Sequence, residues 1–489
     1  MLFNSFSFFV FFPVVTVLYF LLPQRYRWML LLFASCIFYM AFIPYYILIL
    51  FVTISIDYYA GIKIQESIGR RRKIYLIISI ISTCTVLIIF KYFNFFNANL
   101  SVIAQFFDWN YPIGLINIIL PIGLSFHTFQ SLSYVIEVYR NKQKAERHFG
   151  IYSLYVMFYP QLVAGPIERP QNLLHQFYEK HIVDFERITA GLQRMLWGFF
   201  KKIVIADNLA VYVNQVYAFP HDYSGLTLLA ATFFFAIQIY CDFSGYSDIA
   251  IGSAEVMGFK LMDNFKTPYF AVSIADFWRR WHISLSTWFR DYVYIPLGGN
   301  RVSRSRWYFN IMVTFVLSGL WHGANWTYII WGGIHGFYLS MSHIKEKIFP
   351  AFAKATAGKQ KIFIQNIFQR LWVFILVLFA WIFFRANTVF DAWYIVKASI
   401  ASIFHPQGGL NALFLPLSNS PSSGTFYFSL VCAVLVIFFL AEIIDYKRGL
   451  LQTLRLQNAW VRYGLYTALI LAIINLGVTQ EMRFIYFQF

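Results

Sequence analysis

Long apolar runs, separated by short polar and basic clusters, follow one another along most of this chain. The stretches MLLLFASCIFYM and LVCAVLVIFFLAEII are continuously apolar. A strand of a transmembrane barrel would instead alternate apolar and polar residues over about 10 positions. A helix that crosses a membrane needs about 20 mostly apolar residues. The pattern therefore predicts an all-α fold, a polytopic bundle of transmembrane helices.

The apolar runs also predict where the membrane-spanning helices lie, to within a few residues. A first span covers residues 3–22, and the run 28–60 is long enough for two helices that turn at Pro44. Further spans are expected at 74–96, 188–217, 226–257, 308–342, 366–384, 425–443 and 460–478, with a break inside 308–342. In total we expect about 10–12 spans, together with re-entrant or interfacial helices.

The composition excludes several other classes of protein. Of the 489 residues, 59% are hydrophobic and 12% are charged, which is about half the charged share of a soluble domain. The formal net charge is +17, but Lys and Arg form short clusters between apolar runs, so we expect no nucleic-acid partner. The cysteines have the spacing of neither a zinc site nor a disulfide framework, and we expect no bound metal. They are Cys36, Cys84, Cys241 and Cys432.

Basic clusters predict how the chain is oriented, because Lys and Arg are enriched in cytoplasmic loops. The densest cluster, GRRRK at 69–73, follows three predicted spans, so the N-terminus is expected outside the cytoplasm. The segment 398–446 contains no Lys or Arg, and its loop PLSNSPSSG is expected outside as well, like the C-terminus. Because no soluble domain, long linker or repeat interrupts the pattern, residues 1–489 are interpreted as a single membrane domain.

Polar residues enter the apolar segments between Gln238 and Asn325. Three stretches contain them: QIYCDFSGYSD at 238–248, DFWRRWHISLSTWFRDYVYIPLGGNR at 276–301, and SGLWHGANW at 318–326. Such a density of polar groups is costly at membrane depth and is tolerated where they face a bundle interior or a water-filled cavity. We therefore expect the functional site in this part of the chain.

The first stretch offers Gln238, Tyr240 and Asp242 as the lining of a polar path. Asp242 and Asp248 are carboxylates six residues apart, with Gly245 between them to loosen the helix. They could orient a catalytic group, or they could form a hydrogen-bonded pair that pins neighbouring helices, since buried carboxylates usually have partners. Both interpretations stay open.

The second stretch places Arg279, Arg280, His282 and Arg290 among tryptophans. Trp and Arg anchor amphipathic helices at the membrane interface. Arginines beside tryptophans also suit the phosphates and adenine of a nucleotide-bearing donor. The sequence leaves both interpretations open, and an interfacial helix alone explains His282 less well.

The third stretch contains the strongest candidate for a catalytic group, His322. Neighbouring glycines permit a helix break or a close backbone approach. Trp321 and Trp326 would exclude water from the imidazole, and Asn325 lies in the same stretch. A shielded neutral imidazole can take a proton near neutral pH. The alternative is a core histidine bonded to a backbone carbonyl. His335 would lie on nearly the opposite face of an unbroken helix, and we interpret it as structural.

Four motifs in this order resemble the bacterial membrane-bound O-acyltransferases (MBOATs) and, among them, the membrane component of alginate O-acetylation. The motifs are PQLVAGPIERP at 160–170, QIYCDFSGYSDIAIG at 238–252, DFWRRWHISLSTWFRDYVYIPLGG at 276–299, and LWHG at 320–323. The N-terminal FNSFSFFVFFPVV and the terminal FIYFQF are similar too. The resemblance thus covers essentially the whole chain, with a signature core at about 150–343.

The resemblance implies a membrane-bound acyltransferase with a central tunnel, in which His322 matches the catalytic histidine and His282 the second signature position. It also implies that the polar segment around Asp242 lies near that tunnel. The expected donor is acetyl-CoA, a substrate rather than a bound cofactor. It would enter from the cytoplasm beside Arg279, Arg280, Arg301, Arg304 and Arg306. The final acceptor would be an extracytoplasmic polysaccharide such as alginate or peptidoglycan.

Partners and location follow from the same resemblance. We expect a multi-pass protein of the bacterial inner membrane, in contact with lipid, which works with a periplasmic SGNH-type acetyltransferase. Two alternatives come from other classes of protein. One is a transporter of a small anion or a lipid-linked sugar with His322 as a proton relay, although the sequence has no internal repeat. The other is a non-catalytic scaffold of a polysaccharide-secretion complex.

Overall fold

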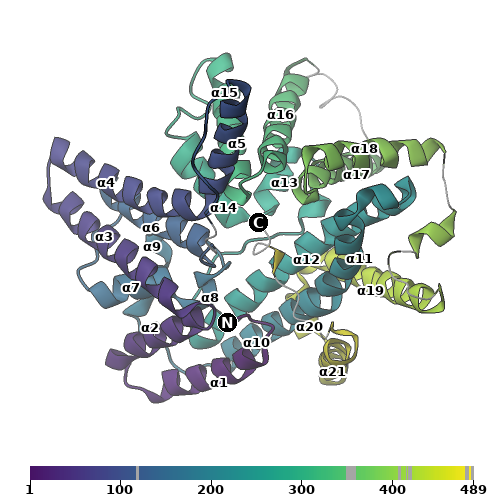
Figure 1. Cartoon of the computed structure of the whole chain (residues 1–489). Helices are drawn as coiled ribbons and strands as arrows, with labels where there is room; N and C mark the ends of the chain where they lie inside the picture. Colours follow the sequence, from purple (N-terminus) through teal and green to yellow (C-terminus); the bar gives the residue numbers. More distant parts are fainter. Residues whose placement is uncertain are drawn as a thin grey trace. The chain divides into compact units, whose positions relative to one another are not determined.

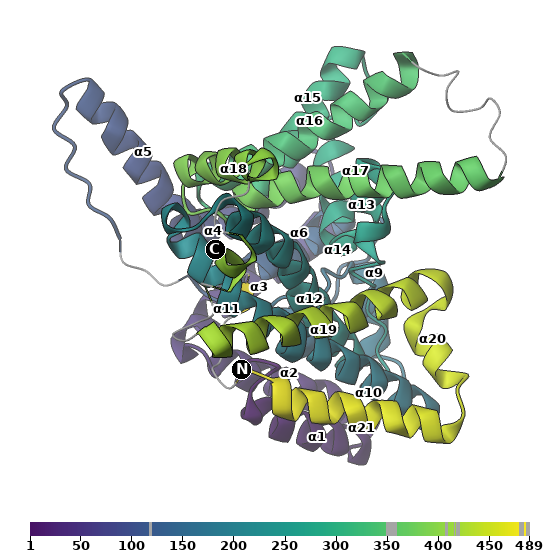
Figure 2. The ribbon, with the colours of Figure 1, turned by 90° about the vertical axis from the view of Figure 1, so that its right-hand side faces the viewer.

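The computed structural model of this protein describes residues 1–116, 120–348, 359–405, 409–414, 416, 421–478 and 484–485. These residues form α-helices with brief 3-10 and π-helical segments, and none of them lies in a β-strand (Figure 1, Figure 2). Six described segments are long and apolar enough to cross a membrane: Pro44–Glu66, Arg70–Phe106, Gly225–Met257, Asn366–Arg385, Phe428–Arg448 and Ala459–Leu476. The predicted all-α membrane fold is confirmed. The count of 10–12 spans includes shorter helices and stays a prediction.

The internal contacts of the chain divide it into two compact units. Unit 1 comprises Met1–Met195 and Tyr246–Met262, and unit 2 comprises Leu196–Gly245 and Asp263–Phe489. The long helix α12, Gly225–Met257, begins in unit 2 and ends in unit 1. The interpretation of residues 1–489 as a single membrane domain stays a prediction.

Unit 1 contains the N-terminal helices. They are α1 (Phe6–Leu21), α2 (Gln24–Met40), η1 (Pro44–Tyr46), α3 (Ile47–Glu66), α4 (Arg70–Leu87), η2 (Ile88–Tyr92), α5 (Phe93–Phe106), α6 (Leu124–Tyr139), α7 (Phe149–Met157), α8 (Tyr159–Leu162), α9 (Pro170–Leu173), η3 (Leu174–Phe177) and most of α10 (Phe185–Phe199). Pro44 begins η1 between α2 and α3, which confirms the predicted turn. Asp57 of α3 accepts hydrogen bonds from Ser79 at 2.5 Å and Thr83 at 3.1 Å, both on α4. Hydrogen bonds of this kind join helices inside a membrane.

Unit 2 contains the predicted catalytic histidines. Besides the first part of α12, its elements are η4 (Phe200–Ala206), α11 (Asp207–Ala218), η5 (Pro220–Asp222), η6 (Pro268–Phe270), α13 (Ile274–Arg280), α14 (Ile283–Phe289), η7 (Arg290–Tyr294), α15 (Arg304–His322), α16 (Trp326–Ile348), α17 (Lys359–Arg385), α18 (Val389–Phe404), η9 (Leu410–Leu413), α19 (Pro421–Arg448), α20 (Leu450–Arg455) and α21 (Ala459–Leu476). The break expected inside 308–342 is confirmed and lies at 323–325, between α15 and α16. Residues 417–420 of the predicted outer loop at 416–424 lie outside the described residues, and α19 begins at Pro421.

The helices α15 and α16 approach closely because glycines face backbone atoms of the neighbouring helix. A Cβ atom on Gly319 would lie 2.2 Å from the carbonyl oxygen of Tyr328. One on Gly332 would lie 2.2 Å from the carbonyl oxygen of Phe315. Small residues permit this kind of close packing between membrane helices. The pair thereby brings the last residue of α15, His322, against α16.

The helix α12 is continuous through Gly245, so the predicted loosening of the helix at this residue is wrong. The glycine instead provides room for the chain beside it. A Cβ atom here would lie 2.8 Å from the carbonyl oxygen of Gly198 and 3.0 Å from the backbone nitrogen of Lys202. Gly245 therefore allows a close approach between α12 and the α10–η4 junction.

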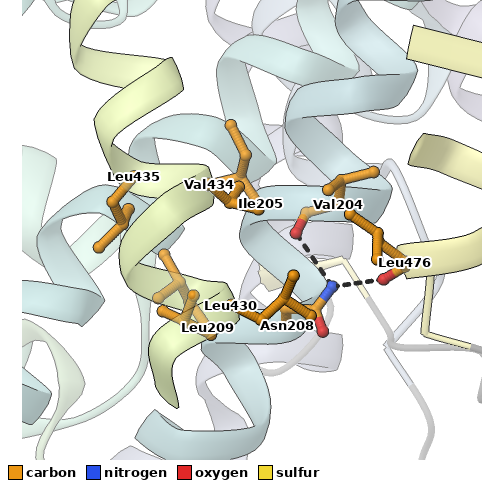
Figure 3. A pocket seen from close by; sticks show the side chains of 9 residues that line it. Val204, Ile205, Asn208, Leu209, Leu430, Val434, Leu435 and Leu476 are labelled. Atoms are coloured by element: carbon orange, nitrogen blue, oxygen red, sulfur yellow. Dashed lines mark hydrogen bonds between the residues drawn. The ribbon is translucent and has the colours of Figure 1, made fainter. Parts of the chain in front are cut away.

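A small apolar pocket of about 10 Å³ lies among η4, α11, α19 and the end of α21 (Figure 3). At its edge the side-chain amide of Asn208 donates hydrogen bonds to the carbonyl oxygens of Val204 at 3.0 Å and Leu476 at 2.8 Å. These bonds attach the end of α21 to η4. The pocket is about the size of a single water molecule, and none of the predicted site residues lines it. It is therefore a packing feature and no substrate site.

Candidate active site

The imidazole of His322 lies in an aromatic cage built by three helices of unit 2. Its ring centroid is 4.9 Å from that of Trp321 on α15 and 5.0 Å from that of Trp331 on α16. On the third side, the ring of Phe384 on α17 lies 5.3 Å away. Only 3% of the surface of His322 is exposed. The three rings therefore shield this imidazole from water.

His282 lies fully buried between α13 and α14 in a left-handed backbone conformation, with φ of +43°. Such a conformation costs a residue other than glycine about 1–3 kcal/mol and persists where the surroundings enforce it. The Oδ1 atom of Asn264 lies 3.4 Å from Nδ1 of His282. The same oxygen accepts hydrogen bonds from the N–H and hydroxyl groups of Ser284 at 3.1 and 2.7 Å. Phe243 meets the imidazole edge to face at 4.5 Å.

One indole connects the two predicted catalytic histidines. The ring centroid of Trp321 lies 6.3 Å from that of His282 and 4.9 Å from that of His322. The two histidines are 40 positions apart in the sequence. His282 lies in the turn between α13 and α14, and His322 ends α15, yet both imidazoles lie beside this indole. The structure thus places both residues in one buried group.

Asp242 belongs to a buried ion network that the sequence interpretation missed. The Nζ atom of Lys202 lies 2.8 Å from a carboxylate oxygen of Asp242 and 2.7 Å from one of Asp207. The other oxygen of Asp242 accepts the backbone N–H of Ile485 at 2.8 Å. The network therefore ties η4, α11, α12 and the C-terminal segment together. The feature of the sequence that could have predicted this network is a pair of lysines inside the apolar stretch FFKKIVIA.

Asp248 does not bind Asp242, because residues six apart on a continuous helix point to different sides. Its carboxylate forms an ion pair with Arg194 at 2.9 Å, within unit 1. Within unit 2, the hydroxyl of Tyr240 donates to a carboxylate oxygen of Glu442 at 3.0 Å. Gln238 is buried on the same helix. The polar residues of α12 thus have separate partners, and Asp242 and Asp248 do not form a pair with each other.

A cavity of about 510 Å³ lies between the segment α13–α14–η7 and the helix pair α15–α16. Its walls combine apolar and aromatic side chains with hydroxyl groups. The lining side chains that bear on the chemistry are Trp278, Phe289, Phe315, Ser286, Thr287, Thr314 and Ser318. Thr314, Ser318 and His322 follow one another at intervals of four on α15 and so share a face of the helix. The cavity therefore extends along α15 to one turn from His322.

The five arginines predicted to hold the donor do not form one group. Arg279 lines the cavity, whereas Arg280 binds Asp276 at 3.0 Å. The other three, Arg301, Arg304 and Arg306, are exposed, and the cavity lining does not include them. Arg290, which the sequence placed in the same cluster beside tryptophans but not among these five, also lines the cavity. It follows Trp288 by two positions in the motif WFRDY.

The polar residues after the helix break also have defined places. The side-chain amide of Asn325 donates to the carbonyl oxygen of Asn387 at 3.0 Å, and its Oδ1 accepts the N–H of Thr327 at 3.1 Å. Because the helix is broken after His322, the face argument for His335 does not apply. The indole N–H of Trp278 donates to Nδ1 of His335 at 3.3 Å. His335 also contacts Trp331, a residue of the His322 cage, at 5.1 Å.

Comparison with known proteins places this geometry among acyltransferases. The model of the MBOAT, membrane-bound O-acyltransferase family matches residues 148–384. The chain is 42% identical over 403 residues to the probable alginate O-acetylase AlgI of Pseudomonas aeruginosa, which covers 81% of this chain and 74% of that protein. It is 35% identical over 435 residues to the peptidoglycan O-acetyltransferase of Helicobacter pylori, with coverages of 82% and 80%. A more distant relative, 28% identical over 244 residues, is the teichoic acid D-alanyltransferase of Bacillus subtilis, with coverages of 47% and 61%.

The family match includes both buried histidines and the cavity between α13 and α16. The named relatives are acyltransferases, whereas the alternatives considered from the sequence were a transporter and a scaffold. This chain belongs to the membrane-bound O-acyltransferase family and is a multi-pass membrane enzyme that transfers acyl groups.

Proposed function

We propose that this protein takes an acetyl group from cytoplasmic acetyl-CoA and passes it across the bacterial inner membrane for the O-acetylation of an extracytoplasmic polysaccharide. The observation that supports this most is the burial of His282 and His322 on either side of Trp321. The named relatives act on alginate and peptidoglycan, and they make these two polymers the first candidates for the acceptor.

In this proposal His322 is the general base. Its imidazole takes the proton of the attacking hydroxyl as the hydroxyl oxygen forms a bond to the thioester carbonyl carbon. The former carbonyl oxygen of the resulting tetrahedral intermediate is an oxyanion. The C–S bond then breaks, and the departing thiolate takes the proton from the imidazolium. General base catalysis contributes about 10² to 10⁴ in rate. The aromatic cage supports the role, because water in the site would hydrolyse the donor.

His282 is assigned to orient a substrate group. The Oδ1 atom of Asn264 is an acceptor, since it receives two hydrogen bonds from Ser284. The Nδ1 atom of His282 that faces it is therefore a donor, which leaves Nε2 as the acceptor nitrogen of the neutral ring. An acceptor can hold an N–H or O–H group of a substrate but cannot stabilise an oxyanion. This favours a positioning role for neutral His282 over an oxyanion role.

The cavity beside α15 is the proposed path of the donor. Arg279 and Arg290 suit the phosphates of CoA, because a guanidinium offers a planar fork of donors. The apolar walls and the hydroxyl groups of Thr314 and Ser318 suit the pantetheine arm, which is partly apolar and carries amides. The reactive thioester would then lie near His322, one turn beyond Ser318.

The acceptor approaches from the periplasmic side in this scheme. The acetyl group reaches the polysaccharide either directly or through the serine of a periplasmic SGNH-type acetyltransferase. The protein also contacts the surrounding membrane lipid. The more distant D-alanyltransferase matches less than half of this chain, which favours acetyl over D-alanyl transfer.

The proposal is tested by incubating membrane vesicles that contain the protein and its acceptor polymer with acetyl-CoA labelled in the acetyl group. We expect base-labile label on the polymer. Labelled D-alanine on its carrier serves as the competing donor. Label that comes from D-alanine and not from acetyl-CoA would overturn the donor assignment.

A further inference from the structure

Two arginines from different helices of unit 2 meet at one pair of aromatic rings near the end of α19. The rings of Phe270 and Tyr446 are stacked, with centroids 5.0 Å apart and planes 14° apart. The charged end of Arg280 lies 5.7 Å from the ring centroid of Tyr446, and that of Arg370 lies 4.9 Å from the same centroid. The helices α13, α17 and α19 thus bring two cations to a single ring.

The ends of two apolar segments indicate how deep this group lies in the membrane. Arg370 lies four positions after the start of the segment Asn366–Arg385, and Tyr446 lies two positions before the end of the segment Phe428–Arg448. Tyrosine and arginine are enriched where a membrane helix leaves the hydrocarbon. Leu371, which follows Arg370, is 58% exposed and can contact an acyl chain. The two arginines are therefore expected at the depth of the lipid phosphates.

The guanidinium of Arg370 is half-buried and is not neutralised by the chain. Its Nη2 atom donates to the hydroxyl of Tyr446, a neutral group, at 2.9 Å. No ion pair joins Arg370 to a carboxylate in the part of the chain that the structure describes. Arg280 binds Asp276 at 3.0 Å. One carboxylate thus serves two guanidinium groups, and the pair of arginines keeps a net positive charge.

Further cations near the two arginines favour a headgroup with net negative charge. The exposed ones are Lys266, Lys447 and Arg448. The backbone N–H of Lys266 donates to the carbonyl oxygen of Arg280 at 3.0 Å. The acidic residue of the same stretch of α19, Asp445, accepts the backbone N–H of Leu450 at 2.8 Å. This excess of positive charge attracts anionic lipid and repels the ammonium group of a zwitterionic lipid.

We propose that Arg280 and Arg370 together bind the phosphate of an anionic phospholipid. A phosphodiester has two unesterified oxygens, and each can accept hydrogen bonds from one guanidinium. The stacked rings of Phe270 and Tyr446 keep the two guanidinium groups close to each other despite their equal charge. The inference goes beyond the proposed function and does not depend on it, because neither arginine belongs to the lining of the proposed donor cavity.

The test measures lipid binding by native mass spectrometry of the intact protein in a neutral detergent. Phosphatidylglycerol is the anionic probe, and phosphatidylcholine with the same acyl chains is the zwitterionic one. We expect the wild-type protein to bind phosphatidylglycerol more tightly. Arg370→Gln should weaken that binding about 10-fold, which corresponds to the loss of one charge-assisted contact. Arg370→Lys should recover part of the loss, because it keeps the charge but not the planar fork.

Arg462 is the matched control. It is also half-buried, lies three positions after the start of the apolar segment Ala459–Leu476, and has its guanidinium 5.7 Å from the ring centroid of Tyr463. Arg462→Gln should bind phosphatidylglycerol as the wild type does. Equal losses in Arg370→Gln and Arg462→Gln would assign the effect to general interfacial charge and overturn the proposal.

Two further arms distinguish lipid from soluble phosphates. Neither inorganic phosphate nor CoA in excess should displace phosphatidylglycerol. Displacement by inorganic phosphate would make the site one for a soluble anion, and displacement by CoA alone would make it part of the donor site, so either result would overturn the proposal. Arg280→Gln is the second variant and should show the same loss as Arg370→Gln. Wild-type affinity for phosphatidylglycerol in either variant would also overturn it.

Discussion

Trp321 and His322 are adjacent in the chain, and their rings meet edge to face with centroids 4.9 Å apart. The indole also borders His282, so it covers the space between the two histidines. Replacing Trp321 by Ala should admit water to this space. We expect a larger share of acetyl-CoA to be hydrolysed to free acetate instead of acetylating the polymer, because water then competes with the acceptor hydroxyl.

The measurement is the ratio of free acetate to polymer-bound acetate after reaction with labelled acetyl-CoA. Trp321→Phe keeps an aromatic ring and should keep the ratio close to the wild-type value. An Ala variant with an unchanged ratio would show that the indole does not exclude water.

His282→Asn should retain more acetyl transfer than His282→Ala. Asn tolerates the left-handed backbone conformation that the chain adopts at this position, whereas Ala does not. Asn also offers a side-chain oxygen that can accept a hydrogen bond from a substrate group. Initial rates in membranes, normalised to the amount of inserted protein, provide the comparison. Equal rates for the two variants would remove His282 from substrate positioning.

The double variant Arg279→Gln, Arg290→Gln should raise the apparent KM for acetyl-CoA. Both side chains line the cavity proposed for the donor, and the loss of even one charge-assisted bond to phosphate corresponds to about 10-fold in affinity. The exposed pair Arg304 and Arg306 supplies the control. If instead Arg304→Gln, Arg306→Gln raises KM and the first variant does not, the donor enters elsewhere.

Lys202→Met should destabilise unit 2 by about 3–5 kcal/mol, because two buried carboxylates, Asp207 and Asp242, would lose their cation. The midpoint of thermal unfolding in detergent should fall accordingly. Lys63→Met is the control, since Lys63 pairs with Glu66 at an exposed site and should have little effect. A Lys202→Met protein as stable as the wild type would mean that the carboxylates are not both charged.

The positions of the main apolar helices could be predicted from the sequence, because hydrophobic length alone determines whether a helix can cross a membrane. The turn at Pro44 and the break after His322 also follow from local rules for proline and glycine. Gly245 shows the limit of such rules. Its role is a close approach to the backbone of Gly198, and only the tertiary structure reveals which chain lies there.

Both histidines could be identified from their motifs, but the contacts that hold them could not. Asn264 and Phe384 are distant from His282 and His322 in the sequence and belong to no charged or repeated pattern. Their importance depends on which helices become neighbours. The arginines show that prediction from sequence has the same limit. They form a basic cluster in the sequence, but in the structure Arg279 lines the cavity while Arg301, Arg304 and Arg306 are exposed.

The most direct test of the central claim is the rate of acetyl transfer by His322→Gln in membrane vesicles supplied with acetyl-CoA and acceptor polymer. Gln approximates the shape of the imidazole but cannot take a proton from a hydroxyl. We predict a rate about 10² to 10⁴ below that of the wild type, with normal insertion, while His335→Gln, in the neighbouring aromatic cluster, loses much less. Transfer by His322→Gln at the wild-type rate would contradict the assignment of His322 as the base.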